Sequence, residues 1–147
     1  MMAGFLVIIS VMDDMRVINT RTIEDFRAAR GGGSFAGRQL LLLTTRGRVT
    51  GRPHTTPMMY VLDGDHLVVL ASNAGATEPP EWYRNLLAQP TVTVEAGAEV
   101  YIATARPAEG EERARLWRSI TEQYPFFLEH EQKAGRTIPI VTLARVS

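Results

Sequence analysis

The sequence contains no cysteine. This absence excludes disulfide bonds, thiolate zinc sites, iron–sulfur clusters and a thiol nucleophile. The chain also lacks an excess of charge of either sign, because its 16 Lys and Arg residues balance 16 Asp and Glu residues. Nucleic-acid-binding domains usually carry a basic excess. We therefore expect no nucleic-acid partner and infer that the partner is a small molecule.

No hydrophobic run is long enough for a transmembrane helix. The apolar stretch from Gly4 to Met12 is far shorter than the roughly 20 residues that a spanning helix needs. Asp13 and Asp14 follow it, where a signal peptide would have a small-residue cleavage site. We therefore predict a cytoplasmic protein. Two interpretations of the N-terminal segment stay open: a strand or loose chain start, and a hydrophobic flap that makes a peripheral membrane contact.

Metal-ligand motifs are absent as well. The three histidines, His54, His66 and His130, do not have ligand spacing, and no two of them lie within one helical turn. We predict no metal site. The 147 residues suffice to bury one core. With no repeat or linker in the sequence, we predict an apolar N-terminal segment, 1–19, followed by one domain, 20–147.

The stretch NTRTIEDFRAARGGG has the pattern of a capped amphipathic helix. Thr22 and Asp25 are three residues apart, as in an N-terminal capping pair. Ile23 and Phe26 lie on one face, and Gly31 provides a stop signal. The pattern predicts a helix that begins near Thr22 and ends at Gly31.

Three more helices are predicted toward the C-terminus. EPPEWYRNLLAQP begins with prolines and places Trp82, Leu86 and Leu87 at helical spacing. EGEERARLWRSITEQYP has acidic residues in its first turn, where they favour the helix macrodipole. A short helix from Phe126 to Lys133 follows it.

Strand signals lie between these helices. QLLLLTT is short and continuously apolar, which favours a buried strand. MMYVLDGDHLVVLAS has a DGD turn between two apolar runs and predicts a hairpin. TVTVEAGAEVYIATARP predicts a second hairpin, and TIPIVTLARV a last strand. Short strands with interspersed helices indicate an α+β fold with a closed or partly closed antiparallel barrel.

The loop TTRGRVTGRPHTTP, residues 44–57, combines glycines with fixed hydrogen-bond donors. Gly47 and Gly51 permit positive φ, and consecutive amides at such turns can bind an anion. Guanidinium groups suit phosphate and carboxylate. The arginines of this loop are Arg46, Arg48 and Arg52. Because GxxxxGK[ST] and GxGxxG are both absent, the residues alone leave two interpretations, a phosphate cradle and a solvated arginine-rich loop.

Several motifs together resemble one known family. In order, they are LLLLTTRGRVTGRPHTTPMMYVLDGDHLVVLAS, the Gly75-Ala76 step, PPEWYRNLLAQPTVTVE, QYP and GRTIPIV. They look like the deazaflavin-dependent nitroreductases of the flavin/deazaflavin oxidoreductase superfamily, over Phe35 to Val146. The resemblance implies a split β-barrel (FMN-binding-like) with short peripheral helices. It also implies hydride transfer from reduced coenzyme F420, an 8-hydroxy-5-deazaflavin, to an electron-poor acceptor such as a quinone, enone or nitroaromatic.

The resemblance implies a position for the coenzyme. Coenzyme F420 carries a phosphodiester and an oligoglutamate tail, which the arginine-rich loop would hold. Val49 and Asn73 stand where relatives often have lysine, so two cations are missing. Met58 and Met59 would support the deazaflavin ring, or they pack in the core. The implied coenzyme-binding residues are Arg46, Arg48, Thr50, Gly51, Arg52, His54, Pro57, Met58, Met59, Ala71, Ser72, Asn73, Gly75 and Ala76.

The implied substrate side consists of Tyr124, Phe127 and His130, where tyrosines recur in the best-known nitroreductase branch. Tyr124 keeps a hydroxyl, and His130 can donate a proton. Phe127 cannot. Tyr124 and His130 are therefore the candidate catalytic residues, although His130 can also be read as an exposed helix residue.

Two alternatives to this reductase stay open. One is an FMN-binding split-barrel oxidoreductase. The other is a non-catalytic coenzyme- or lipid-binding protein. The sequence leaves both a monomer and a homodimer possible.

Overall fold

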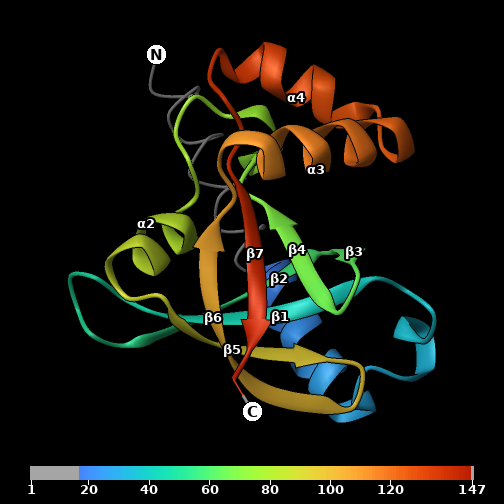
Figure 1. Cartoon of the computed structure of the whole chain (residues 1–147). Coiled ribbons are helices and arrows are strands. Elements are labelled where there is room, and N and C mark those ends of the chain that lie inside the picture. The colour runs from blue at the N-terminus through green and yellow to red at the C-terminus, as the bar shows by residue number, and fades with distance from the viewer. Residues whose placement is uncertain (1–16, 147) are drawn as a thin grey trace, which may run out of the picture.

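The computed structural model describes residues 17–146. Seven strands form one antiparallel sheet with the order β2-β1-β5-β6-β7-β4-β3. The strands are β1 (Leu40–Arg46), β2 (Pro53–Met59), β3 (Val61–Asp63), β4 (His66–Leu70), β5 (Thr91–Ala96), β6 (Glu99–Pro107) and β7 (Ile140–Arg145). Only Tyr60 separates β2 from β3 in the chain, although these strands lie at opposite ends of the sheet order. One bent segment therefore runs along both ends, and the sheet curls into a split barrel (Figure 1).

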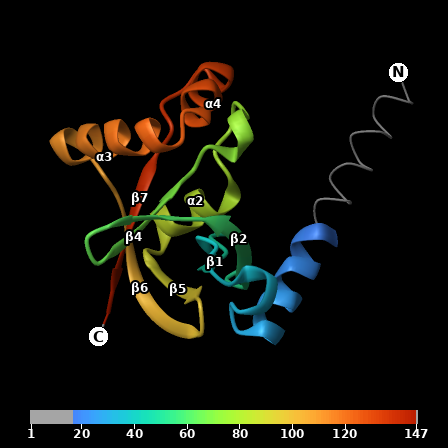
Figure 2. The ribbon, with the colours of Figure 1, turned by 90° about the vertical axis from the view of Figure 1, so that its right-hand side faces the viewer.

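Helices surround this sheet. They are a helix over residues 17–29, α2 (Glu81–Ala88), α3 (Gly110–Gln123) and α4 (Phe126–Ala134), with short 3₁₀ turns η1 (Gly33–Phe35) and η2 (Asn73–Gly75). Figure 2 shows α3 and α4 together at one end of the molecule and the helix over 17–29 on the side of β1 and β2. The predicted α+β barrel with short peripheral helices is confirmed.

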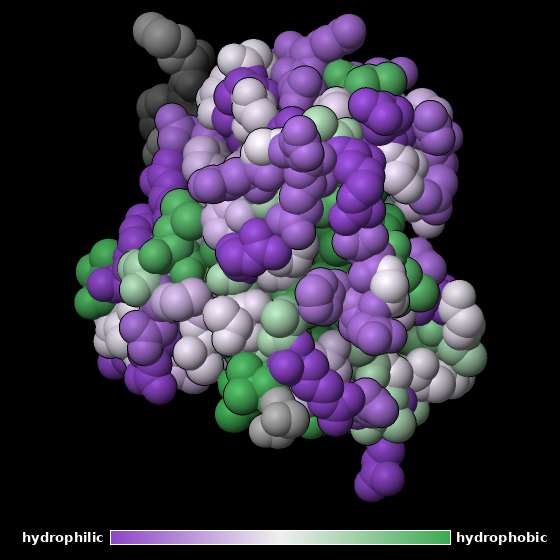
Figure 3. Space-filling view, in the orientation of Figure 1, coloured by the Kyte–Doolittle hydropathy of each residue, from purple (hydrophilic) through white to green (hydrophobic). Residues whose placement is uncertain are grey.

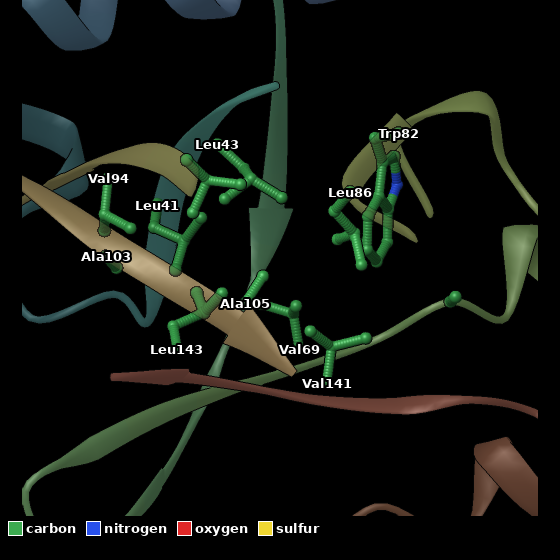
Figure 4. Close-up of a cluster of buried hydrophobic side chains, with 12 residues drawn as sticks. Leu41, Leu43, Val69, Trp82, Leu86, Val94, Ala103, Ala105, Val141 and Leu143 are labelled. Atoms are coloured by element: carbon green, nitrogen blue, oxygen red, sulfur yellow. The ribbon is translucent and has the colours of Figure 1, made fainter. Parts of the chain in front are cut away.

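The main core lies inside the curl of the sheet and is closed by α2 (Figure 4). Leu41 and Leu43 of β1 and Val94 of β5 are fully buried there, since alternate strand residues face inward. Trp82 and Leu86 of α2 pack against them. Full burial of one such side chain contributes about 1.5–3 kcal/mol, so this layer of side chains is the main support of the barrel.

Two smaller clusters attach the remaining helices. Leu116, Ile120 and Phe127 of α3 and α4 pack on β3, β4 and β7. Phe26 of the helix over 17–29 packs with Phe35 and with Leu42 of β1. Their packing places α4 at one end of the barrel and the N-terminal helix on its outer face.

The predicted helix start at Thr22 is wrong. The helix already includes residues 17–21, and the Thr22 hydroxyl donates to the Ile18 carbonyl 2.9 Å away. Its predicted end is confirmed, because Gly31 adopts φ +70° and its N–H donates to the Phe26 carbonyl. Leu87, predicted on the apolar face of α2, is 54% exposed.

The surface over α3 and α4 is mainly hydrophilic in the view of Figure 3, where hydrophobic residues form small patches. None of the helices within residues 17–146 has the length and apolar character needed to cross a bilayer. The interpretations offered for Gly4 to Met12 concern residues outside the described part of the chain.

Candidate functional site

The arginine-rich loop is shorter than predicted. Strand β1 continues to Arg46 and β2 begins at Pro53, so the turn comprises only residues 47–52. The Gly47 N–H donates to the Arg52 carbonyl, and the Gly51 N–H donates to the Gly47 carbonyl, both at 2.8 Å. Gly51 adopts φ +72°. The β-strand signal of residues 53–57 was hidden by their prolines, threonines and histidine, residue types that the sequence analysis assigned to the loop.

Glycine at position 47 permits two side chains to fold over the turn. A Cβ there would lie 2.8 Å from His54 Nε2 and 2.8 Å from Thr50 Oγ1, too close for any other residue type without movement. The turn therefore brings a hydroxyl and an imidazole together above its main chain.

A cavity of about 390 Å³ opens between this turn, β2 and α2. Three of the predicted coenzyme-binding side chains, Arg48, Thr50 and His54, line it. We call it the Arg48 cavity. Its donor set of guanidinium, hydroxyl and imidazole is suited to an anionic group. Of the predicted coenzyme-binding residues, these three are brought together by the structure around one cavity.

Helix α2 positions Arg48. The Arg48 main-chain N–H and Nη1 both donate to Asn85 Oδ1, each at 3.2 Å, and Nη1 also donates to the Glu81 carboxylate. Asn85 is only 4% exposed, and its Nδ2 donates to Thr45 Oγ1 of β1. The hydrogen bond from Arg48 holds the pKa of Glu81 below its ordinary value, despite a small opposing effect of desolvation. The guanidinium is thus held between an amide and a carboxylate.

Sequence reasoning did not find Asn85 and Glu81. It singled out the apolar residues of α2, of which Trp82 and Leu86 pack in the main core. The available signal was the spacing of Glu81 and Asn85, which places both polar side chains on one face of α2. Their partner Arg48 is distant in sequence, so only the fold reveals the contact.

The other two arginines lie outside this cavity. Thr45 of β1 faces inward at 1% exposure, so Arg46 faces outward. Arg46 donates to the Gly51 carbonyl and lines a separate hollow of about 400 Å³ on the outer side of the sheet. Arg52 is exposed, and its main-chain N–H donates to Thr50 Oγ1. The structure therefore does not bring Arg46 and Arg52 together with Arg48.

A second group of predicted residues surrounds η2. Ala71 and Ser72 are buried, and Asn73 donates through its side chain to the Glu78 carbonyl. Gly75 adopts φ +82° and faces α4. A Cβ on Gly75 would lie 3.0 Å from Lys133 Cδ. The absence of a side chain at position 75 therefore allows α4 to pack closely against this segment.

Arg136 fastens this segment. Its guanidinium donates to the main-chain carbonyls of Ala71, Ser72, Ala76 and Glu78, at 3.1–3.3 Å. Sequence reasoning included Arg136 only as part of the GRTIPIV motif. One arginine after α4 thus fixes the whole segment that was predicted to approach the coenzyme.

The β2 residues after the turn are part of the core surface. Pro57, Met58 and Met59 are half-buried. Met58 packs on the main core, and Met59 packs on the cluster beneath α3 and α4. These contacts support the core-packing interpretation of the two methionines.

The predicted substrate side lies at the start of α4. The Tyr124 hydroxyl donates to Gln39 Oε1 at 3.3 Å. The Phe126 ring is 6.1 Å from the Tyr124 ring and 5.4 Å from the His130 ring, measured between centroids. Phe127 is only 3% exposed and belongs to the core. The accessible aromatic set is therefore Tyr124, Phe126 and His130, of which sequence reasoning missed Phe126.

His130 has one polar atom without a partner. Its Nδ1 is buried and accepts or donates no hydrogen bond within the described part of the chain. Phe126 and Phe127 pack against the imidazole edge to face. The His130 imidazole of the α4 face is therefore packed between these two aromatic rings.

Comparison with solved structures defines the class of this barrel. An F420-H2-dependent reductase, FDR-A, is 37% identical, with a TM-score of 0.65 over 72% of this chain and 94% of that chain. A second structure, described as a domain-swapped dimer, is 33% identical, with a TM-score of 0.67 over 84% of this chain and 96% of that one. The fold is shared even with HutZ, a heme storage protein from Vibrio cholerae, at 20% identity and a TM-score of 0.54. The class is therefore that of the split-barrel proteins, as predicted.

The family follows from the sequence matches. The model of the F420H2-dependent quinone reductases matches residues 15–145. An F420H2-dependent quinone reductase of Mycobacterium tuberculosis is 36% identical over 108 residues, which cover 71% of this chain and 72% of the relative. This chain belongs to the F420H2-dependent quinone reductase family. The resemblance seen in the sequence is thereby confirmed.

Proposed function

We propose that this protein reduces a quinone with coenzyme F420H2, and that the Arg48 cavity holds an anionic part of the coenzyme. The protein is an F420H2-dependent oxidoreductase by family. The quinone as acceptor rests on the name of that family and of its relatives. The single structural observation behind the proposal is the cavity, in which Arg48, Thr50 and His54 converge from one turn.

The residues present fit an anionic ligand. Arg48 offers a guanidinium that is 31% exposed and so remains accessible from the cavity. Thr50 and His54 lie beside it because Gly47 leaves room for them. A charge-assisted hydrogen bond from such a group is stronger than a neutral one. Arg48, Thr50 and His54 would therefore hold the phosphodiester, with Asn85 keeping Arg48 in place.

The α4 face would serve the acceptor. When bound, the reduced coenzyme supplies a hydride, which carries both electrons. The hydride also delivers one hydrogen, so conversion of a quinone to a hydroquinone requires one further proton, on the oxygen that develops the negative charge. Tyr124 Oη or the His130 imidazole would donate this proton, and a donor aimed at the developing oxyanion lowers the barrier by about 3–4 kcal/mol. Phe126 between them offers an apolar ring for contact with the acceptor.

The segment around η2 connects the two sides. Gly75 packs against α4, and Arg136 ties the same segment to the start of β7. Ala71, Ser72, Asn73 and Ala76 would form the wall against which the deazaflavin lies. This placement remains a proposal that follows from the resemblance and from the close packing of η2 on α4.

Fluorescence titration of the purified apoprotein tests the proposal. Oxidised F420 should bind tightly and with salt sensitivity, while FMN run in parallel should bind weakly. The reduced coenzyme should then be oxidised in the presence of a soluble quinone, followed by its absorbance. Binding of FMN alone would favour the FMN-dependent alternative. F420 binding without any turnover of quinones, enones or nitroaromatics would favour a coenzyme-binding protein.

The oligomeric state is open to a separate measurement. One solved relative forms a domain-swapped dimer. For this chain, monomer and homodimer are both compatible with the proposed site. Sedimentation velocity with and without F420 distinguishes them.

A further inference from the structure

A carboxylate lies inside the cavity that we assign to an anion. Glu81, the first residue of α2, lines the Arg48 cavity and accepts a hydrogen bond from Arg48 Nη1. A group that repels anions is unexpected there. In the free protein, the Arg48 guanidinium is therefore already paired with a carboxylate of the same chain.

The charge of the cavity is consequently low. Arg48 and Glu81 compensate each other, and Arg46 and Arg52 lie outside the cavity lining. Val49, which also lines the cavity and is 85% exposed, brings no charge. An incoming anion meets one guanidinium that is already paired.

The geometry allows exchange of partners. Asn85 is buried and holds the Arg48 main chain and Nη1, so Arg48 stays in position when the carboxylate leaves. The Glu81 side chain is 69% exposed and is free to turn toward water. Arg84 offers it a second cation, at 3.8 Å. The Glu81 carboxylate can therefore be displaced without breaking the wall of the cavity.

We infer that Glu81 is a specificity determinant, because its carboxylate competes with the anionic group of the ligand for Arg48 and lowers the affinity for highly charged ligands. This inference rests on the proposed function and names the ligand charge as the property that the site selects. Displacement of Glu81 reduces the binding free energy of any anionic ligand once. Every further negative charge of the ligand near the carboxylate adds repulsion. The protein therefore favours coenzyme forms with few negative charges at this end.

A purely structural role of Glu81 makes a different prediction. As an acidic residue in the first turn of α2, Glu81 also stabilises the helix. Loss of the Glu81 carboxylate would then lower the thermal stability of the protein and weaken the binding of charged and uncharged ligands alike. Competition instead affects only ligands that carry an anion at Arg48.

The experiment compares Glu81→Gln with Glu99→Gln. Glu99 is the matched control because its exposed carboxylate also pairs with an arginine, Arg145, and lies outside the cavity lining. Each protein is titrated by fluorescence with oxidised F420 of short and long glutamate tail, and with the same deazaflavin without phosphodiester and tail. Thermal unfolding is recorded for every variant.

Glu81→Gln should bind F420 about two- to fivefold more tightly than the wild type, the range expected for one exposed ion pair. The gain should be larger for the longer tail and absent for the uncharged deazaflavin. In an Arg48→Met background the gain should disappear. Glu99→Gln should bind all three ligands like the wild type.

Unchanged or weaker F420 binding by Glu81→Gln would overturn the competition while leaving the proposed function intact, provided that the wild type binds and oxidises F420H2. An equal change for charged and uncharged deazaflavin would also overturn it. If the wild type binds no F420, the proposed function fails first, and the inference with it.

Discussion

At the scale of single residues, three neighbouring arginines point in different directions, and only one of them points into the Arg48 cavity. Alternation along β1 turns Arg46 away from the cavity, whereas the turn directs Arg48 into it. The sequence shows three equivalent cations, because residue type does not reveal direction. Arg48, Thr50 and His54, which the resemblance implied, do line one cavity, and its role in coenzyme binding stays a prediction.

Arg48→Ala should weaken F420 binding by about 1.5 kcal/mol, roughly tenfold, because it removes a charge-assisted bond to the anion. We expect the low end of the usual range, since Glu81 already competes for the guanidinium. Fluorescence titration measures the loss. Arg118→Ala, an exposed substitution on α3, is the control and should not change the dissociation constant. Equal affinity of Arg48→Ala and wild type would remove Arg48 from the coenzyme site.

At the scale of elements, the contact between η2 and α4 joins the proposed coenzyme side to the proposed acceptor side. Gly75 lies against His130 and Lys133 of α4. Arg136, just after the C-terminus of α4, donates to the same segment that contains Gly75. The residues proposed for the coenzyme and those proposed for the acceptor therefore lie on adjacent segments. A shift of η2 would displace His130 directly. The His130 Cα lies only 3.4 Å from the position that a Cβ on residue 75 would take.

Gly75→Ala should destabilise the protein by about 2–3 kcal/mol. The new Cβ has a strained positive φ, which costs about 1–3 kcal/mol, and it also presses on Lys133. Gly135→Ala is the matched control, because Gly135 has φ +64° but nothing within 4 Å of its Cβ position. Urea denaturation should show a smaller loss for Gly135→Ala than for Gly75→Ala. Equal losses would mean that the contact with α4 contributes nothing.

Most elements could be predicted because their signals are local. The DGD turn, the prolines before α2 and the acidic first turn of α3 each identify an element from a few adjacent residues. Thr22 was misleading because a threonine inside a helix can bond to the carbonyl four residues earlier, as it does here. The start of β2 was missed because Pro53 and Pro57 are unusual strand residues.

The site was harder to predict than the elements. Asn85, Glu81, Gln39 and Arg136 act through partners from 33 to 85 residues away in the chain. No local pattern specifies such pairs. They exist because the barrel brings α2 against the turn after β1, and α4 against η2.

At the scale of the whole molecule, the bent segment from β2 to β3 determines the shape. It pairs with β1 at one end of the sheet order and with β4 at the other, so one continuous segment joins the two ends of the sheet. The Arg48 cavity lies beside the first part of this segment, and the cluster beneath α4 contacts the second part. Stability of the barrel and geometry of the site are therefore linked through this one segment.

Leu43→Ala should destabilise the whole barrel by about 2–5 kcal/mol, because Leu43 is fully buried in the main core and its truncation leaves a cavity. Leu62→Ala, on β3 but 61% exposed, is the control and should cost less than about 0.5 kcal/mol. Chemical denaturation followed by tryptophan fluorescence measures both, since Trp82 lies in the same core. The unfolding transition of Leu43→Ala should stay single and shift to lower denaturant, because the sheet is closed by one continuous segment. A separate early transition of β1 and β2 would show instead that the barrel unfolds in parts.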